Sequence, residues 1–185
     1  MIQTVVYKRA ETSEELQQIL NLQQSNIKHA LSSDAIRDEG FVSVEHTFDV
    51  LKRMNDACPH IIAKSEGRVV AYALCMLNAF RNDVPTLIPM FNYMDKVIES
   101  KNLTDLRYLI MGQICVDKAY RKQGVFKNLY RSFREELKSD FDAVITEVNT
   151  KNIRSSKAHK AVGFKTLDVH AESGEDWELI IWKWK

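Results

Sequence analysis

The 185-residue chain has too few cysteines for a disulfide framework. Cys58, Cys75 and Cys115 are odd in number, and two of them lie within apolar runs, which indicates buried free thiols in a reducing cytoplasm. The first residues carry charges and lead into no apolar segment, so we expect no signal peptide. No apolar run reaches ~18 residues, the length that a membrane-spanning helix needs. These absences predict a cytoplasmic protein without a membrane partner.

An excess of one charge sign is also absent, as are the common cofactor motifs. Lys and Arg number 26 against 25 Asp and Glu, so no overall field favours binding to nucleic acid. The sequence contains no glycine-rich nucleotide-phosphate motif and no nucleophile elbow of the G-x-S-x-G type. Its five histidines are scattered without metal-ligand spacing. We therefore expect no nucleic-acid partner and no bound metal.

The remaining composition is that of an ordinary soluble globular protein. Hydrophobic residues make up 45% of the chain and charged residues 28%, which suffices for a packed core. At this length one domain over residues 1–185 is the simplest organisation, although two small domains would also fit.

Hydrophobic periodicity predicts an alternation of strands and helices. A short strand around Val5 and Tyr7 precedes a helix that the capping box Thr12-x-x-Glu15 opens, and Ser43 is expected to cap a second helix through Val44 and Met54. Further expected elements are a hairpin from His60 to Leu77, a strand from Leu106 to Val116, a helix after Gly124, a strand from Ala143 to Val148, a short helix from Asn152 to Val162, and strands at Lys165–His170 and Trp177–Trp184. This order predicts an α/β (α+β) fold with helices on both faces of a mixed sheet.

Two intervening segments are harder to assign. The polar stretch from Ser32 to Gly40 is expected to be a loop. Residues 81–104 contain Pro85 and Pro89, and a helix from Phe91 to Ile98 would fit the spacing of their apolar residues.

The stretch from Met111 to Leu137 is the most informative part of the chain. An apolar run ends at Val116, a short basic loop follows, and an amphipathic helix begins beside Gly124. The first N–H groups of a helix lack internal partners, and the helix dipole adds roughly half a positive charge there. Because Gly124 has no side chain, the backbone can approach a ligand closely. The combination favours an anion site of the kind that holds phosphates, against the alternative of a plain strand–loop–helix junction.

This loop resembles a motif of a known family. Arg121-x-x-Gly124 is similar to the R/Q-x-x-G-x-G/A pyrophosphate loop of the GNAT superfamily of N-acetyltransferases, with Phe126 in place of the last small residue. A second match lies in residues 149–164, NTKNIRSSKAHKAVGF, which resembles the family's N-x-x-A-x-x-x-Y-x-x-x-G-F segment. There Ser155 stands for the usual Ala and His159 for the usual Tyr.

The resemblance implies a fold, a cofactor and a set of site residues. It implies a central mixed sheet of about six to seven strands, with residues 81–104 as an insertion that shapes the acceptor site. It also implies acetyl-CoA as cosubstrate, whose pantetheine arm would pair with the strand before the loop and whose pyrophosphate would face the loop. The implied cofactor-binding residues are Ile114, Cys115, Val116, Arg121, Lys122, Gln123, Gly124, Val125, Phe126, Asn152 and Ser155.

Two residues are candidates for catalysis. His159 occupies the position of the family's proton-donating tyrosine, and an imidazole pKa near ~6.5 suits proton exchange at neutral pH. Glu147 lies near the end of a strand, where a glutamate acts as base in some members of the family, and its apolar neighbours would raise its pKa. The alternative for Glu147 is an exposed strand carboxylate or an ion-pair partner for a lysine. Gln113 could face the same cleft and orient a water.

The sequence thus indicates an acetyl-CoA-dependent N-acetyltransferase that moves an acetyl group directly to a primary amine in a ternary complex. The acceptor would be a small-molecule or peptide amine, and homodimerisation is common in the family. The alternative is a non-catalytic acyl-CoA-binding or sensor module of the same fold, which the changes at Phe126 and His159 keep open. Transfer of a longer acyl chain is a third alternative.

Overall fold

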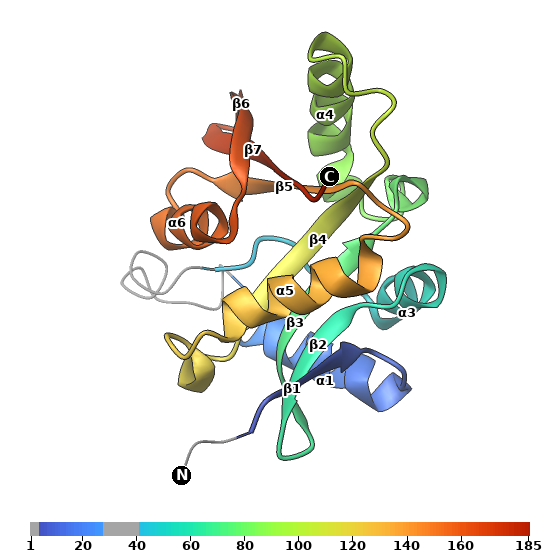
Figure 1. The fold of residues 1–185 in the computed structure, drawn as a ribbon, viewed down its shortest axis with the longest axis vertical. Helices are drawn as coiled ribbons and strands as arrows, with labels where there is room; N and C mark the ends of the chain where they lie inside the picture. Colours follow the sequence, from blue (N-terminus) through green and yellow to red (C-terminus); the bar gives the residue numbers. More distant parts are fainter. Residues whose placement is uncertain (1–3, 28–40) are drawn as a thin grey trace.

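Seven strands form one sheet in the computed structural model, which describes residues 4–27 and 41–185 (Figure 1). The strands are β1 (Val6–Arg9), β2 (Ile61–Ser65), β3 (Arg68–Met76), β4 (Tyr108–Val116), β5 (Ala143–Asn149), β6 (Lys165–Glu172) and β7 (Glu175–Lys183). The helices are α1 (Ser13–Gln24), α3 (Phe48–Ala57), α4 (Ile88–Ser100), α5 (Val125–Leu137) and α6 (Ile153–Val162). The predicted mixed α+β architecture is confirmed, while the loop expected at 32–40 lies outside the described residues.

The sheet order is β1-β2-β3-β4-β5-β7-β6, and only β4 and β5 run parallel to each other. Two hydrophobic clusters fill the two faces. One face carries α1, α3 and α4, and the other carries α5, with Leu129, Tyr130 and Phe133 among its fully buried side chains. Figure 1 shows α5 crossing one face of the sheet, with α1 and α3 behind it. This two-sided burial is what the near-continuous apolar run of β3 requires.

The capping signals explain one correct helix start and one wrong prediction. Thr12 and Glu15 form the predicted capping box of α1. The cap of α3, by contrast, is Thr47, whose side chain accepts from the N–H of Val50. Ser43 was wrong as the cap because the segment before Thr47 is not helical and instead bonds to α1 and β4. His46 N–H donates to Gln23, and the carbonyl of Val44 accepts from Gln113.

The segment 81–104 is mostly helical and is anchored in the core. The helix expected at Phe91–Ile98 is confirmed and is longer, with Pro89 in its first turn. Phe91 and Met94 are fully buried in the cluster shared with α1 and α3. In Figure 1, α4 stands at one end of the molecule, and its contacts include β6. Deleting the segment would therefore remove part of the core as well as any wall of a cavity.

The three cysteines are free and buried, as the sequence predicts. Among residues 4–27 and 41–185, no helix is long and apolar enough to cross a membrane.

Candidate active site

A divergence between β4 and β5 opens the centre of the sheet. The two strands pair only from Tyr108 to Ile110 on β4, and the next contact is a hydrogen bond of 3.0 Å from Thr146 Oγ1 to the carbonyl oxygen of Met111. The register of β4 against β3 shifts at Gly112, which marks a bulge. A Cβ on Gly112 would come within 3.3 Å of Met76 Cβ, so this site favours glycine. Beyond Ile110 no described strand pairs with this edge of β4. The carbonyls of Met111 and Val116 accept from Thr146 and Arg121, and the remaining backbone groups of this edge are open to a ligand.

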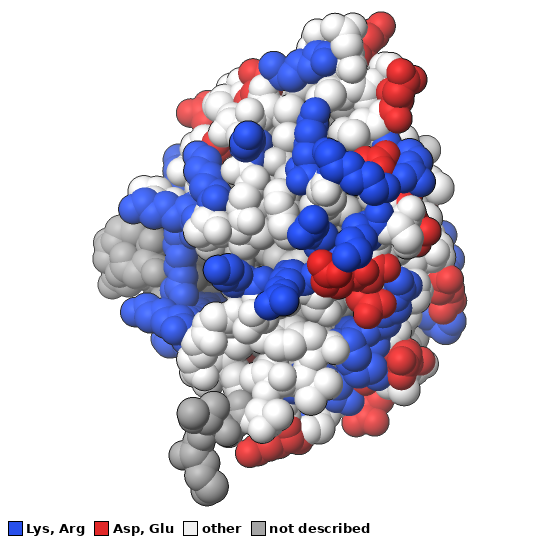
Figure 2. Space-filling view, in the orientation of Figure 1, with Lys and Arg blue, Asp and Glu red and all other residues white. Residues whose placement is uncertain are grey.

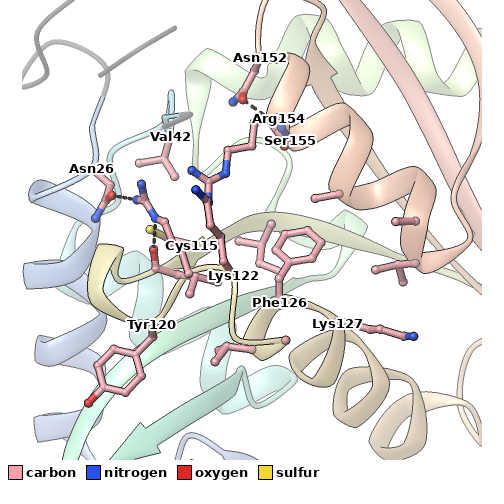
Figure 3. Close-up of a pocket in the computed structure, with 18 of the residues that line it drawn as sticks. Asn26, Val42, Cys115, Tyr120, Lys122, Phe126, Lys127, Asn152, Arg154 and Ser155 are labelled. Atoms are coloured by element: carbon pink, nitrogen blue, oxygen red, sulfur yellow. Dashed lines mark hydrogen bonds between the residues drawn. The ribbon is translucent and has the colours of Figure 1, made fainter. Parts of the chain in front are cut away.

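A cavity of about 340 Å³ lies beside the basic loop, and we call it the loop cavity (Figure 3). The expected cofactor-binding residues line it with one exception. Those that line it are Ile114, Cys115, Val116, Arg121, Lys122, Gly124, Val125, Phe126, Asn152 and Ser155. The exception is Gln123, which is exposed and whose side-chain amide donates to the carbonyl oxygen of Ala119 at 2.7 Å.

The loop presents the start of α5 to this cavity. Gly124 is the N-cap with φ +80°, and Lys122 also has a left-handed φ of +62°. No side chain of residues 4–27 or 41–185 caps the helix, so its first N–H groups have no partner of this kind there. A Cβ on Gly124 would meet only Asn128 Nδ2 at 3.8 Å. The glycine is thus required by its backbone angle and not by crowding.

Arg121 holds the basic loop in place through two hydrogen bonds. Its Nε donates to the carbonyl oxygen of Val116 at 2.9 Å, and its Nη2 donates to Asn26 Oδ1 at 2.6 Å (Figure 3). The guanidinium therefore joins the end of β4 to the turn after α1. The same side chain lines the loop cavity.

Further cations come from outside the loop. Arg154 on α6 was not singled out from the sequence, although it lies in the second motif, and Figure 3 shows it extending toward Lys122 across the cavity. Lys127 also lines the cavity. Figure 2 shows many Lys and Arg side chains on the face that α5 covers, with acidic residues between them. The loop cavity therefore has a local excess of positive charge in a chain that is nearly neutral.

The second motif forms α6 as predicted. Asn152 is the N-cap and accepts from the N–H of Ser155 at 3.2 Å, while Gly163 ends the helix with φ +127°. The apolar residues of this helix have different surroundings. Ala158, Ala161 and Val162 line the loop cavity, whereas Ile153 in the first turn is 59% exposed.

His159 lies within a cluster of aromatic rings. Its ring centroid is 5.2 Å from that of Phe126, 5.5 Å from Tyr130 and 5.1 Å from Phe164. Nδ1 lies 2.8 Å from the carbonyl oxygen of Ser155 and must donate to it, whereas Nε2 is buried without a partner among the described residues. Burial lowers the pKa of His159 to about 4, so the imidazole is neutral at pH 7.

A second cavity, of about 510 Å³, lies between the diverging strands and below α4, and we call it the strand cavity. Glu147 and His159 both line it, and Phe41, Val42, Ile114, Asn152 and Ser155 line both cavities. The Glu147 side chain is 10% exposed. Burial, together with the negative charge of Glu172, raises the pKa of Glu147 to about 7.

Two other polar residues of β4 are accounted for by packing. Gln113 lines the strand cavity, but its amide accepts from Tyr72 and Gln23 and donates to the carbonyl of Val44. Burial raises the pKa of the Cys115 thiol to about 12, so it is protonated at neutral pH and unsuited to act as a nucleophile.

Comparisons with known proteins show the family and the fold of the chain. Residues 25–164 match the model of the acetyltransferase (GNAT) family. The chain belongs to the GNAT family. Among solved structures similar to this GNAT protein, the ribosomal-protein-S18-alanine N-acetyltransferase of Escherichia coli has 14% identity and a TM-score of 0.62, with 97% of this chain and 94% of that chain covered.

Two further solved structures resemble this GNAT protein to a similar degree. An N-acetyltransferase of Staphylococcus aureus Mu50 has 16% identity and a TM-score of 0.66, with 98% and 99% of the two chains covered. The yncA protein of Salmonella typhimurium, solved with its cofactor acetyl-CoA, has 14% identity and a TM-score of 0.60, with 98% and 94% covered. At these identities the likeness concerns the fold. No curated protein sequence matches the chain.

Proposed function

We propose that this GNAT protein is an acetyl-CoA-dependent N-acetyltransferase that acts on a primary amine within a ternary complex. The observation that carries the proposal is the shared wall of the two cavities along the open edge of β4. The loop cavity is suited to the cofactor, and the strand cavity is suited to the amine. Both substrates can then be present together, which direct transfer requires.

The residues of the loop cavity fit acetyl-CoA. The uncapped N–H groups at the start of α5 suit the pyrophosphate, and Lys122 and Arg154 add positive charge. The open edge of β4 at Ile114 and Val116 can pair with an extended pantetheine arm. When bound, acetyl-CoA supplies an activated acetyl group as a thioester. Phe126 at the usual small position packs against His159 and leaves the backbone donors free.

Glu147 supplies the group that the chemistry needs on the acceptor side. An amine with a pKa near ~10.4 reaches the cavity as an ammonium ion and must lose a proton before its lone pair can attack. We assign that proton to Glu147, directly or through a water. The N–C bond to the acetyl group then forms, the C–S bond breaks, and the departing thiolate takes up a proton. A carboxylate with a pKa of about 7 is partly ionised at neutral pH and can both accept and release the proton.

We propose that His159 donates a proton to the thiolate. To do so, the imidazole must first take up a proton. Its neutral ring, with Nδ1–H bound to the carbonyl of Ser155, has no proton on Nε2 to give. The negative charge of a thiolate beside the ring would raise the imidazole pKa and favour uptake of a proton from the site. His159 would then relay a proton and not store one.

The acceptor is an amine of a small molecule or a peptide. Three carboxylates, Glu147, Glu172 and Glu175, line the strand cavity, and no Lys or Arg lies among its described lining residues. This charge favours a cationic acceptor. We also propose that residues 1–185 form one domain in which the segment 81–104 shapes the acceptor site, through Leu87 and Met90. A cytoplasmic location and a homodimer remain predictions from the sequence.

The first experiment is calorimetric titration of acetyl-CoA and desulfo-CoA into the wild type and Gly124→Glu. The added carboxylate would repel the pyrophosphate at the start of α5, so we expect micromolar binding to the wild type and at least a 10-fold loss in the variant. Gly67→Glu is the matched control, because Gly67 has the same φ of +80° in the β2–β3 turn, with open space around it.

The outcomes separate the proposed enzyme from its alternatives. No binding to the folded wild type, or equal binding in the Gly124 and Gly67 variants, would refute the assignment of the loop cavity. Tight binding without turnover of any amine would favour an acyl-CoA sensor of the same fold. Competition by longer acyl-CoA thioesters would show whether the cavity accepts a longer chain.

A further inference from the structure

Three side chains from three separate elements meet behind the strand cavity. Tyr93 of α4 stacks on His170 of β6, with ring centroids 3.7 Å apart and 21° between the ring planes. Nε2 of His170 lies 3.3 Å from Oε1 of Glu147 on β5. Glu147 lines the cavity, and His170 lies behind it. Tyr93, His170 and Glu147 therefore lie in a row, and Glu147 is the carboxylate that we assign as base.

The imidazole of His170 and the carboxyl group of Glu147 are largely shielded from water. The side chains of His170 and Glu147 are 9% and 10% exposed. Neither Glu147 Oε1 nor the two ring nitrogens of His170 have a hydrogen-bond partner within the described residues. The separation of 3.3 Å is within reach of a hydrogen bond, but the orientation of the ring does not provide one. A small rotation of the imidazole would satisfy two buried polar atoms at once, which favours that rotation.

We propose that His170 is a positioning residue for Glu147: its Nε2–H donates to Oε1 and holds the carboxylate toward the acceptor, while Tyr93 fixes the imidazole ring. The proposal rests on the proposed function only in that Glu147 takes the amine proton. A hydrogen bond to an ionised carboxylate is stronger than one to its protonated form. His170 therefore also favours the ionised form of Glu147, the form that acts as base.

The groups around His170 leave it neutral. From its own strand, the charges of Glu172 and Asp168 favour the imidazolium, but burial outweighs them and lowers the pKa of His170. From α4, the Tyr93 hydroxyl faces Asp168, and Lys101 just beyond that helix offsets the charge of Asp168. From β5, Glu147 is the facing acid. A neutral imidazole has one N–H, which is the donor that the proposal requires.

The test is a direct titration of the Glu147 carboxyl group by carbon-13 NMR on protein labelled at glutamate, with the signal assigned through Glu147→Gln. His170→Phe keeps a ring for Tyr93 to stack on but removes the donor, and His170→Gln restores a donor. We expect the Glu147 midpoint to rise by about one pH unit in His170→Phe and to return toward the wild-type value in His170→Gln. An unchanged or lowered midpoint in His170→Phe would overturn the proposal.

A second pair of variants tests the stacking contact. Tyr93→Phe keeps the ring, and Tyr93→Leu removes it. We expect the Glu147 midpoint to rise in Tyr93→Leu and to stay near the wild-type value in Tyr93→Phe. Equal effects in both variants, or no effect in Tyr93→Leu, would remove Tyr93 from the arrangement. Near-UV circular dichroism and acetyl-CoA affinity confirm that each variant is folded.

The pH dependence of kcat/KM for the amine separates this proposal from the proposed function. If kcat/KM for the amine follows the NMR midpoint across the variants, both are supported. If the NMR midpoint moves but no amine is acetylated, or the rate does not follow, His170 still positions Glu147 and the role of Glu147 as base fails.

Discussion

Glu147 carries a carboxyl group that is largely buried, and this burial affects the stability of the fold. Its pKa is raised from an ordinary 4.5 to about 7, so between these values the folded state holds a proton that the unfolded state has released. The contribution of Glu147 to stability is therefore complete below pH 4.5 and is lost as the pH rises through 7. Above pH 7 the fold carries a buried charge, which opposes folding.

Glu147→Gln should stabilise the protein only where the carboxylate is ionised. We expect the free energy of unfolding to rise by roughly 1–3 kcal/mol at pH 8 and to change little at pH 5, as measured by urea denaturation. The same variant should lower kcat/KM by about 10²-fold or more. Glu99→Gln, on the exposed side of α4, is the control and should alter neither quantity. Equal stabilisation at both pH values would contradict the buried charge.

His159→Phe tests the proton relay without disturbing the aromatic cluster. A phenyl ring fits among Phe126, Tyr130 and Phe164, so the affinity for acetyl-CoA should stay within about 2-fold while kcat falls at least about 10-fold. Tyr130→Phe is the control, because it removes only a buried hydroxyl that has no described partner in the same cluster. An unchanged kcat in His159→Phe would exclude His159 from the reaction.

At the scale of elements, α4 belongs both to the core and to the strand cavity. Both Met90 and Met94 belong to the buried cluster. Met94 is fully buried, whereas Met90, one turn earlier, is 9% exposed and also lines the cavity. We expect Met90→Ala to change the KM of the acceptor severalfold and to leave acetyl-CoA affinity unchanged. Met94→Ala, the same substitution on the same helix, should lower stability by about 2–5 kcal/mol and leave the acceptor KM unchanged. Steady-state kinetics and urea denaturation of both variants test this prediction. An acceptor KM in Met90→Ala equal to that of the wild type would exclude α4 from acceptor recognition.

Helix boundaries were predictable where the sequence has both a hydrophobic period and a residue that marks the end of the helix. The capping box at Thr12, the glycine at Gly124 and the glycine at Gly163 mark real helix boundaries. The helix cap predicted at Ser43 was wrong because the segment that follows it bonds to α1 and β4, and no local sequence pattern reveals those distant partners. The loop cavity was predictable for a related reason, since its residues come mostly from two continuous stretches of sequence.

The strand cavity was much less predictable. It arises where β4 and β5 diverge beyond Ile110, and the divergence depends on the pairing of strands that are distant in sequence. Burial of Glu147 could be anticipated from its apolar neighbours, but the approach of His170 and Tyr93 could not. These three residues lie on different elements, so no spacing rule connects them.

At the scale of the whole molecule, the two halves of the chain are interlaced through β4 and α5. β4 pairs with β3, and α5, which follows β4 in the sequence, packs on β1, β2 and β3 of the first half. The cofactor would contact β4, α5 and α6 together. Binding to these elements at once should stabilise the sheet as a unit and not only one part of it.

This interlacing predicts a single thermal unfolding transition that shifts with acetyl-CoA. At a ligand concentration of 100 times Kd, binding adds about 2.7 kcal/mol to the free energy of unfolding. For a chain of this length that corresponds to a rise in Tm of roughly 5–10 °C. The shift should appear equally in near-UV and far-UV circular dichroism and in Gly67→Glu, and it should fall to about half or less in Gly124→Glu, whose affinity is expected to drop at least 10-fold. Two separate transitions, or a shift confined to one of them, would show that residues 1–185 do not unfold as one domain, because ligand bound at β4, α5 and α6 would then stabilise only the part that contains them.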